Sequence, residues 1–122
     1  MQAIFTLPEI NFVGGETQRL EFNLKDANGD VFDADGTTSN FAICSYSNKT
    51  DEPLLEYTPY LNVDSGGVKS VLDVTIPKQD TKDLFGKFIY QLTVIDVTGA
   101  SAIPNQGIMN ISKNINKSFI EE

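Results

Sequence analysis

The run FIYQLTVI at residues 88–95 decides the fold class. Every second residue from Phe88 to Val94 is large and apolar. Apolar residues at alternate positions indicate a β-strand, because successive side chains of a strand point to opposite faces. The other face mixes apolar and polar side chains, namely Ile89, Gln91, Thr93 and Ile95. We therefore expect a central strand that is partly covered on both sides.

The same period of two recurs on the N-terminal side of this strand, in three further segments. No segment keeps the 3.6-residue period of a long helix, so we expect a protein made of strands. The alternating apolar positions are Leu20, Phe22 and Leu24; Phe41 and Ile43; and Val68, Leu72, Val74 and Ile76.

Turn-forming residues separate these segments. The stretch at residues 26–30 contains Asn28-Gly29, a strong hairpin signal, and residues 33–36, 64–67 and 98–99 also predict turns. Residues 54–60 are interrupted by Pro53 and Pro59, and a proline cannot donate a ladder hydrogen bond. We expect one short edge strand there.

The segment at residues 77–85 breaks the strand pattern. It is polar, starts with Pro77 and is followed by Gly86, which predicts a single helical turn with Pro77 as its first residue. This turn is expected to cross from one sheet to the other.

Seven or eight short antiparallel strands with frequent turns predict an all-β fold, an immunoglobulin-like β-sandwich with one short helical crossover near residues 77–85. A chain of 122 residues is expected to form one domain, residues 1–122. Residues 1–14 are expected to be an N-terminal arm or first strand. Residues 114–122 are expected to be a frayed or partner-binding tail.

The composition excludes several kinds of function. The formal net charge is −8, and Arg19 is the only arginine, so binding of nucleic acid or an anionic membrane surface is not expected. The first residues do not form a signal peptide, and no apolar run is long enough for a membrane span. Histidine is absent, which removes Ser-His and Cys-His nucleophile pairs. Cys44 is the only cysteine and is interpreted as a structural residue.

No catalytic residues, cofactor or metal ligands are predicted. The acidic turn at residues 26–30 does not match a helix-loop-helix calcium loop, although a calcium site that also uses Asp33 and Asp35 stays open against ordinary turn chemistry. Gly14-Gly15 lacks the residues of a phosphate loop. A pair of catalytic carboxylates is the weakest reading. Tyr46, Tyr57 and Tyr60 leave a carbohydrate-binding or bacterial surface module as the alternative function.

Three stretches carry a resemblance to a known family. They are residues 15–33, with the turn Asp26-Ala27-Asn28-Gly29; residues 67–76; and residues 86–111, which contain the glycine-led aromatic strand. In these stretches the chain resembles the N-terminal immunoglobulin-like domain of upper baseplate proteins of tailed bacteriophages, and related small prophage tail proteins of Gram-positive hosts. Family members normally continue into a long C-terminal region, whereas this sequence ends at Glu122. The resemblance therefore implies a scaffold or adaptor role.

The resemblance implies a non-enzymatic virion structural protein of the tail or baseplate, made in the host cytoplasm. Its expected partners are other virion proteins and further copies of itself, as a trimer or hexamer. The residues expected to contact partners, unless they only cap the core, lie in the edge segment and near the termini. They are Leu54, Leu55, Tyr57, Tyr60, Phe5, Phe12, Phe119 and Ile120.

Overall fold

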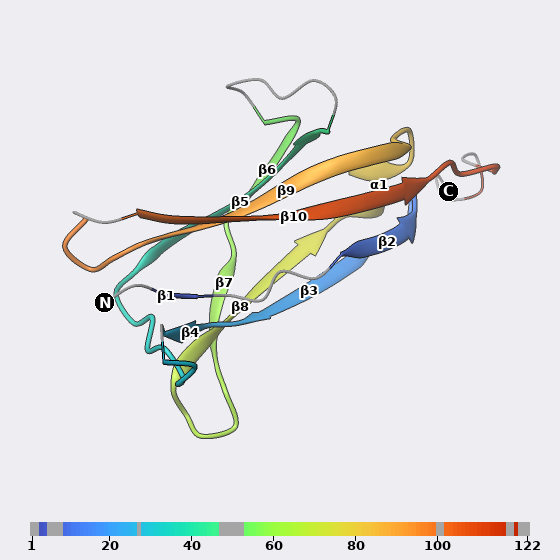
Figure 1. Cartoon of the computed structure of the whole chain (residues 1–122). Helices are drawn as coiled ribbons and strands as arrows, with labels where there is room; N and C mark the ends of the chain where they lie inside the picture. The colour runs from blue at the N-terminus through green and yellow to red at the C-terminus, as the bar shows by residue number, and fades with distance from the viewer. Residues whose placement is uncertain are drawn as a thin grey trace.

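The computed structural model describes residues 3–4, 9–26, 28–46, 53–99, 102–116 and 119. Over these residues the chain forms strands and one short helix, with two larger sheets packed against each other (Figure 1). The elements are β1 (Ala3–Ile4), β2 (Ile10–Val13), β3 (Gln18–Asn23), β4 (Lys25–Asp26), β5 (Thr38–Ser45), β6 (Leu55–Tyr57), β7 (Tyr60–Val63), β8 (Lys69–Ile76), α1 (Lys78–Thr81), β9 (Gly86–Ile95) and β10 (Ala102–Ser112).

The strand order assigns the fold. One sheet has five strands in the order β2-β10-β9-β5-β6, and the other has three in the order β3-β8-β7. In immunoglobulin lettering, β3, β8 and β7 are strands B, E and D, whereas β5, β9 and β10 are C, F and G. β6 is then an added C′ strand, and β1 pairs with β4 in a separate two-stranded sheet. The chain is an immunoglobulin-like β-sandwich, which confirms the predicted fold class.

One pairing differs from the prediction that all strands are antiparallel. β2 runs parallel to β10, with Ile10 opposite Met109 and Val13 opposite Ser112. Parallel neighbours are joined by long connections rather than tight turns, so no local sequence signal marks this pairing. The segment predicted as an arm or first strand thus contributes a strand to the five-stranded sheet.

The predicted apolar stripes meet between the sheets. At the centre, the rings of Phe41 and Tyr90 stack with centroids 5.5 Å apart, and the Phe22 ring lies 5.9 Å from that of Phe41. Gly107 lies opposite Tyr90 in the ladder, and a Cβ at Gly107 would lie only 2.6 Å from the Tyr90 ring. Glycine is therefore required where this ring crosses β10. Core residues are Phe12, Phe22, Leu24, Ala34, Phe41, Ile43, Leu72, Val74, Ile76, Phe88, Tyr90, Leu92, Val94, Met109 and Ile111.

The helical crossover is confirmed. α1 joins β8 of one sheet to β9 of the other, although Pro77 precedes the helix instead of being its first residue. The buried Thr81 hydroxyl accepts a hydrogen bond of 3.0 Å from the Gly15 N–H. A Cβ at Gly14 would lie 2.5 Å from the Thr81 carbonyl oxygen. Gly14-Gly15 is thus a packing site against the crossover.

The segment at residues 54–60 is not one edge strand. It divides into β6, at the edge of the five-stranded sheet, and the start of β7, at the edge of the three-stranded sheet. Thr58 and Pro59 make the change between sheets, and Pro59 is buried there. Two prolines in a short segment had indicated an interruption, but the sequence pattern does not show that the chain changes sheets.

The chain also reverses at the Asn28-Gly29 turn, without forming the predicted hairpin of two full strands. Lys25 makes a single antiparallel bridge to Val31, because β3 pairs with β8 instead. Gly29 has a φ of 83°, and described residues other than glycine have no positive φ.

Candidate protein-protein interface

Two outer strands lie on the same side of the sandwich. β6 ends the five-stranded sheet and β7 ends the three-stranded sheet, and Figure 1 shows β7 continuing down from β6. We call this the β6–β7 side, residues 54–63. Among the described strands, none pairs with the outer backbone edge of either one. This side offers both a backbone edge and exposed side chains to another molecule. Among the described strands, the outer edges of β2 and β3 on the opposite side are also unpaired.

The predicted contact residues in this segment form two pairs. Leu54 and Tyr60 are 52% and 68% exposed, and Val63, which was not predicted, adds to the exposed apolar surface. Leu55 and Tyr57 are half-buried and pack against the core. Leu54 and Tyr60 are thus available to a partner, whereas Leu55 and Tyr57 attach β6 to the core.

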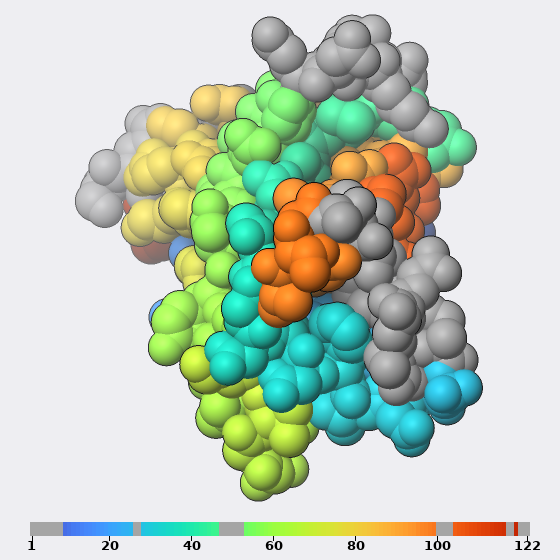
Figure 2. All heavy atoms as spheres, turned by 90° about the vertical axis from the view of Figure 1, so that its left-hand side faces the viewer, coloured from blue at the N-terminus to red at the C-terminus, as the bar shows by residue number. Residues whose placement is uncertain are grey.

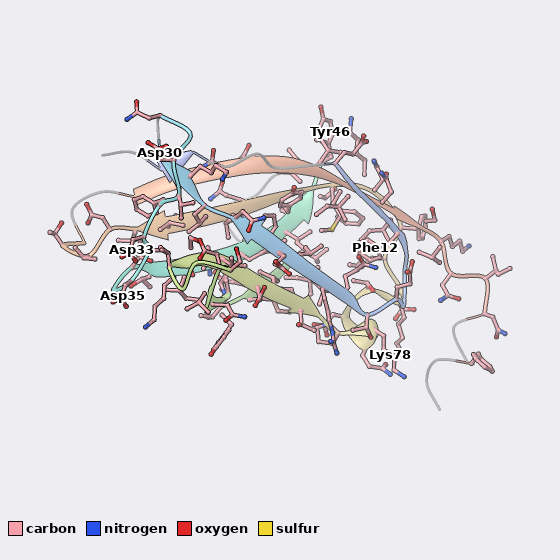
Figure 3. The ribbon with its side chains drawn as sticks, turned by 90° about the horizontal axis from the view of Figure 1, so that it is seen from below. Phe12, Asp30, Asp33, Asp35, Tyr46 and Lys78 are labelled. Carbon is pink, nitrogen blue, oxygen red and sulfur yellow. The ribbon has the colours of Figure 1, made fainter. Side chains whose placement is uncertain are left out.

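The predicted contact residues near the termini also differ from one another. Phe12 is only 6% exposed and belongs to the core, so the alternative that it caps the core holds (Figure 3 labels it). Phe119 is 71% exposed. A second apolar residue in the same segment, Ile115, is 98% exposed. Phe5 and Ile120 lie outside the described residues.

β6 is attached on both of its faces. On the inner face the Tyr57 hydroxyl donates a 2.7 Å hydrogen bond to the Asp80 carboxylate, which lies on α1. Burial, and then the bond to this carboxylate, raise the pKa of Tyr57 above its usual value. On the outer face the Asn40 amide donates to Glu56 at 3.0 Å. β6 therefore presents a fixed edge.

Both edges are protected against unlimited strand addition. β6 has three residues and lies between Pro53 and Pro59. β7 has four residues, and its register with β8 shifts at Asn62 and Val63. Short strands, prolines and bulges are the means by which β-proteins avoid edge-to-edge aggregation. A partner can add only a few backbone hydrogen bonds here, so side chains must supply most of the affinity.

A second surface, the outer face of the five-stranded sheet, was not singled out from the sequence. Its central side chains alternate with core residues of β5, β9 and β10 and so point away from the core. We call these nine residues the five-stranded face: Asn40, Ala42, Cys44, Ile89, Gln91, Thr93, Gln106, Ile108 and Asn110. In the sequence, this face is indicated only by the mixture of apolar and polar residues on the second face of the run at residues 88–95.

The acidic turns gather at one end of the sandwich. Figure 2 shows residues 28–37 in cyan, 64–67 in yellow-green and 96–99 in orange at this end, and Figure 3 labels Asp30, Asp33 and Asp35 there. The Asp33 carboxylate accepts the Asp35 N–H at 3.0 Å, and Asp35 pairs with Lys69 at 3.3 Å. Within the described residues, no three acidic or cysteine side chains meet as a metal site requires. Asp33 and Asp35 thus show the ordinary chemistry of turns.

The three tyrosines considered for sugar binding do not form one platform. Tyr57 points into the sandwich, whereas Tyr46 follows the outer face of β5, where Lys87 Nζ lies 4.0 Å from the centroid of its ring. Tyr60 belongs to the other sheet. Cys44 is half-buried on the five-stranded face. In the described part of the chain, no helix is long and apolar enough to span a membrane.

Comparisons with known proteins add likenesses of fold. No family model matches the chain, and no curated protein matches it. Among solved structures, the chain is similar to the Lin-41 filamin domain, with 14% identity and a TM-score of 0.42 over 92% of this chain and 93% of that one. It is also similar to AggA, the major subunit of aggregative adherence fimbriae type I of Escherichia coli, with 13% identity and a TM-score of 0.35 over 93% and 97%. The fold assignment rests on the strand order.

Proposed function

We propose that this protein is a non-enzymatic structural module that binds another protein through its β6–β7 side. The observation that carries the proposal is the position of two strand edges, which no described strand pairs with, beside exposed Leu54, Tyr60 and Val63. Tyrosine is one of the residues that contribute most to protein interfaces, and an exposed strand edge can add backbone hydrogen bonds to a partner.

The protected edges determine which groups contribute most to the binding of a partner. Because backbone pairing is limited to a few residues, we expect Tyr60 to be the main anchor, since it is the largest exposed side chain on this side. Leu54 and Val63 would then exclude water around it. The Tyr57–Asp80 bond keeps β6 from moving when the partner binds.

The narrower proposal is that this partner is a virion protein, and that the chain is a tail or baseplate scaffold or adaptor. It rests on the resemblance to the domain of upper baseplate proteins, which covers most of residues 15–115. The test is a binding measurement, by biolayer interferometry, between the purified chain and proteins encoded by the neighbouring reading frames.

The surface is tested with matched variants. Tyr60→Asp should weaken binding at least about tenfold, because it places a charge in the expected contact. Val97→Asp is the control, since Val97 is 67% exposed but lies on the turn after β9. Hydrogen exchange should show slower exchange of the β6 and β7 amides in the complex. Equal binding by the two variants, or protection confined to other strands, would reject this surface.

A further inference from the structure

We propose that Asn28 is a site of spontaneous chemical modification. Its side-chain amide is converted to a carboxylate through a cyclic imide that forms with the backbone of Gly29. The site lies in the turn that follows β4, at the end of the sandwich where Figure 3 labels Asp30. Because these residues are not part of the β6–β7 side, the inference does not rest on the proposed partner.

The residue after an asparagine determines whether this imide forms readily. The backbone nitrogen of that residue must reach the side-chain carbonyl carbon of the asparagine, and glycine has no Cβ to hinder the approach. Asn28 is the only asparagine of the chain that a glycine follows. Asn62 and Asn110, for example, are followed by valine and isoleucine, whose branched side chains crowd the backbone nitrogen.

The reacting groups in the turn are open to solvent. Asn28 and Gly29 are both exposed. A Cβ built on Gly29 would have no atom within 4 Å, apart from those of its chain neighbours. No hydrogen bond to another described residue uses the Gly29 N–H. Hydroxide can therefore remove the proton of this N–H, and the nitrogen is accessible for ring closure.

The backbone around Gly29 is not held in a strand ladder. The turn is closed by a single bridge between Lys25 and Val31 and by the 3.1 Å hydrogen bond from the Phe32 N–H to the Leu24 carbonyl oxygen. Glycine is the residue with the widest choice of backbone conformations. Asn62 is the contrast, because it lies opposite Val71 in a ladder and its amide donates to Asp73. The turn can thus reach the geometry that ring closure requires.

The reaction needs water as its only co-reactant. The Gly29 nitrogen, after losing its proton to hydroxide, forms a bond to Asn28 Cγ, and the bond from Cγ to Nδ2 breaks. The leaving nitrogen takes a proton from water and departs as ammonia, which restores the hydroxide. Water then opens the imide at either of its two carbonyl carbons. The product at residue 28 is aspartate or isoaspartate, and no atom is oxidised or reduced.

The modification changes both the charge and the backbone of the turn. It takes the net charge from −8 to −9, at the end of the sandwich that already holds Asp30, Asp33 and Asp35. Isoaspartate also adds one methylene group to the main chain between Lys25 and Val31. We expect this longer turn to weaken the hydrogen bond between the Phe32 N–H and the Leu24 carbonyl oxygen.

Incubation of the full folded chain in a mildly alkaline buffer tests the proposal. Isoelectric focusing should show a more acidic species that grows with time, grows faster as the pH rises, and focuses with the Asn28→Asp variant. Peptide mapping should find aspartate and isoaspartate at residue 28. Asn28→Gln should not give this species, because glutamine cannot form the same ring, whereas Asn62→Gln should react like the natural chain. No acidic species, or an equal amount from Asn28→Gln, would overturn the proposal.

Two further measurements test the role of the fold. A linear peptide of residues 26–31 gives the rate without the fold, and a folded chain that stays unmodified while the peptide reacts would overturn the proposal. Gly29→Ala should slow the reaction, since its Cβ hinders the nitrogen although it meets no other part of the fold. In the purified isoaspartate form, the Phe32 N–H should exchange its hydrogen faster than in the natural chain. Unchanged exchange there would overturn the proposed effect on the turn.

Discussion

The two outer faces of the sandwich are built on the same alternation but differ in chemistry. The five-stranded face has apolar and amide side chains, whereas the outer face of the three-stranded sheet is charged. Arg19, Glu21, Asp73 and Thr75 line a shallow depression between β3 and β8 on that face. Alternation therefore determines which side chains point out, but not what they do there. The charged face is suited to contact with water, whereas the nine residues of the five-stranded face carry no charge themselves, although Glu56 and Lys87 lie beside them.

The largest expected effect compares the buried aliphatic residue on each outer face. Ile89→Asp should lower the free energy of unfolding by about 3 kcal/mol or more, because only Cys44 and Ile108 lie directly across from it. Val71→Asp should cost less, about 2 kcal/mol, since the amides of Asn23 and Asn62 lie opposite it. Urea unfolding measures both.

A matched variant controls for the added charge on the five-stranded face. Thr93→Asp, at a partly exposed outward position on the same strand as Ile89, should change the unfolding free energy by no more than about 0.5 kcal/mol. If Val71→Asp were as costly as Ile89→Asp, the two faces would not differ in the way described.

The second effect concerns the inner side of β10, directly beside the outer face. Gly107→Ala should lower stability by about 2–3 kcal/mol, because the added Cβ would overlap the Tyr90 ring. Thermal unfolding measures this loss, with Gln106→Ala on the outer side as the control. A neutral Gly107→Ala would show that Tyr90 can move, and that the inner side is no more constrained than the outer one.

The third effect compares the outer edges of the two sheets. Tyr57→Phe should cost about 1 kcal/mol because it removes the hydrogen bond to Asp80, whereas Tyr60→Phe removes an exposed hydroxyl and should cost little. Unfolding in urea at neutral pH distinguishes the two variants. Equal losses would mean that β7 is attached as firmly as β6.

Two tyrosines, Tyr57 and Tyr90, make the stability of the fold depend on pH in the alkaline range. Burial raises the pKa of Tyr90 to about 12, and the pKa of Tyr57 is raised as well. The unfolded chain therefore releases these protons first, near pH 10, so stability falls as the pH rises above about 10. Tyr57→Phe should reduce this alkaline loss, and unfolding curves between pH 9 and about 12 measure it. An unchanged loss would rule out a contribution from Tyr57.

The smallest effect lies at the hairpin of the three-stranded sheet. Asp64 accepts hydrogen bonds from the Val68 N–H, from the Ser70 hydroxyl and from the Gly66 N–H, and these bonds, the Val68 bond most of all, lower its pKa. The folded chain keeps this carboxylate ionised where the unfolded chain does not. Its stabilising effect is thus present above about pH 4 and is lost as the pH falls below that.

Asp64→Asn should therefore narrow the difference in melting temperature between pH 7 and about pH 3. Ser65→Ala, in the same turn, controls for a change in the turn itself. If the melting temperature of Asp64→Asn differed between the two pH values as much as that of the natural chain, Asp64 would not be a source of the acid-dependent loss of stability.

The alternation in the sequence was sufficient to predict the main strands and their buried faces, but not the order of the strands in the sheets. The stripe from Phe88 to Val94 lies in the core of a central strand, and the segments around Phe22, Phe41 and Leu72 join it as predicted. Burial of an apolar stripe is a local property of a strand, and local sequence therefore reveals it. The crossover at residues 77–85 was found for the same reason, from its own proline and glycine.

Relations between distant segments could not be predicted. The parallel pairing of β2 with β10, which buries Phe12, joins segments about 100 residues apart. The change of sheets at Pro59 depends on the position of β8, whose free edge β7 joins, and this position is not encoded in the local sequence. The candidate surfaces were predicted only in part. Leu54 and Tyr60 could be predicted because the prolines around them indicate an edge segment. The apolar row of Cys44, Ile89 and Ile108 exists only once three strands are in register.

The parallel pairing of β2 and β10 has a mechanical consequence. Because the strands run in the same direction, the chain enters β2 at Ile10 and leaves β10 at Ser112, at opposite ends of their shared ladder. A force that pulls these two points apart slides one strand along the other and loads the whole ladder at once. Such a force would have to break the hydrogen bonds together instead of opening them one by one. The β2–β10 ladder therefore resists pulling at these two points in shear.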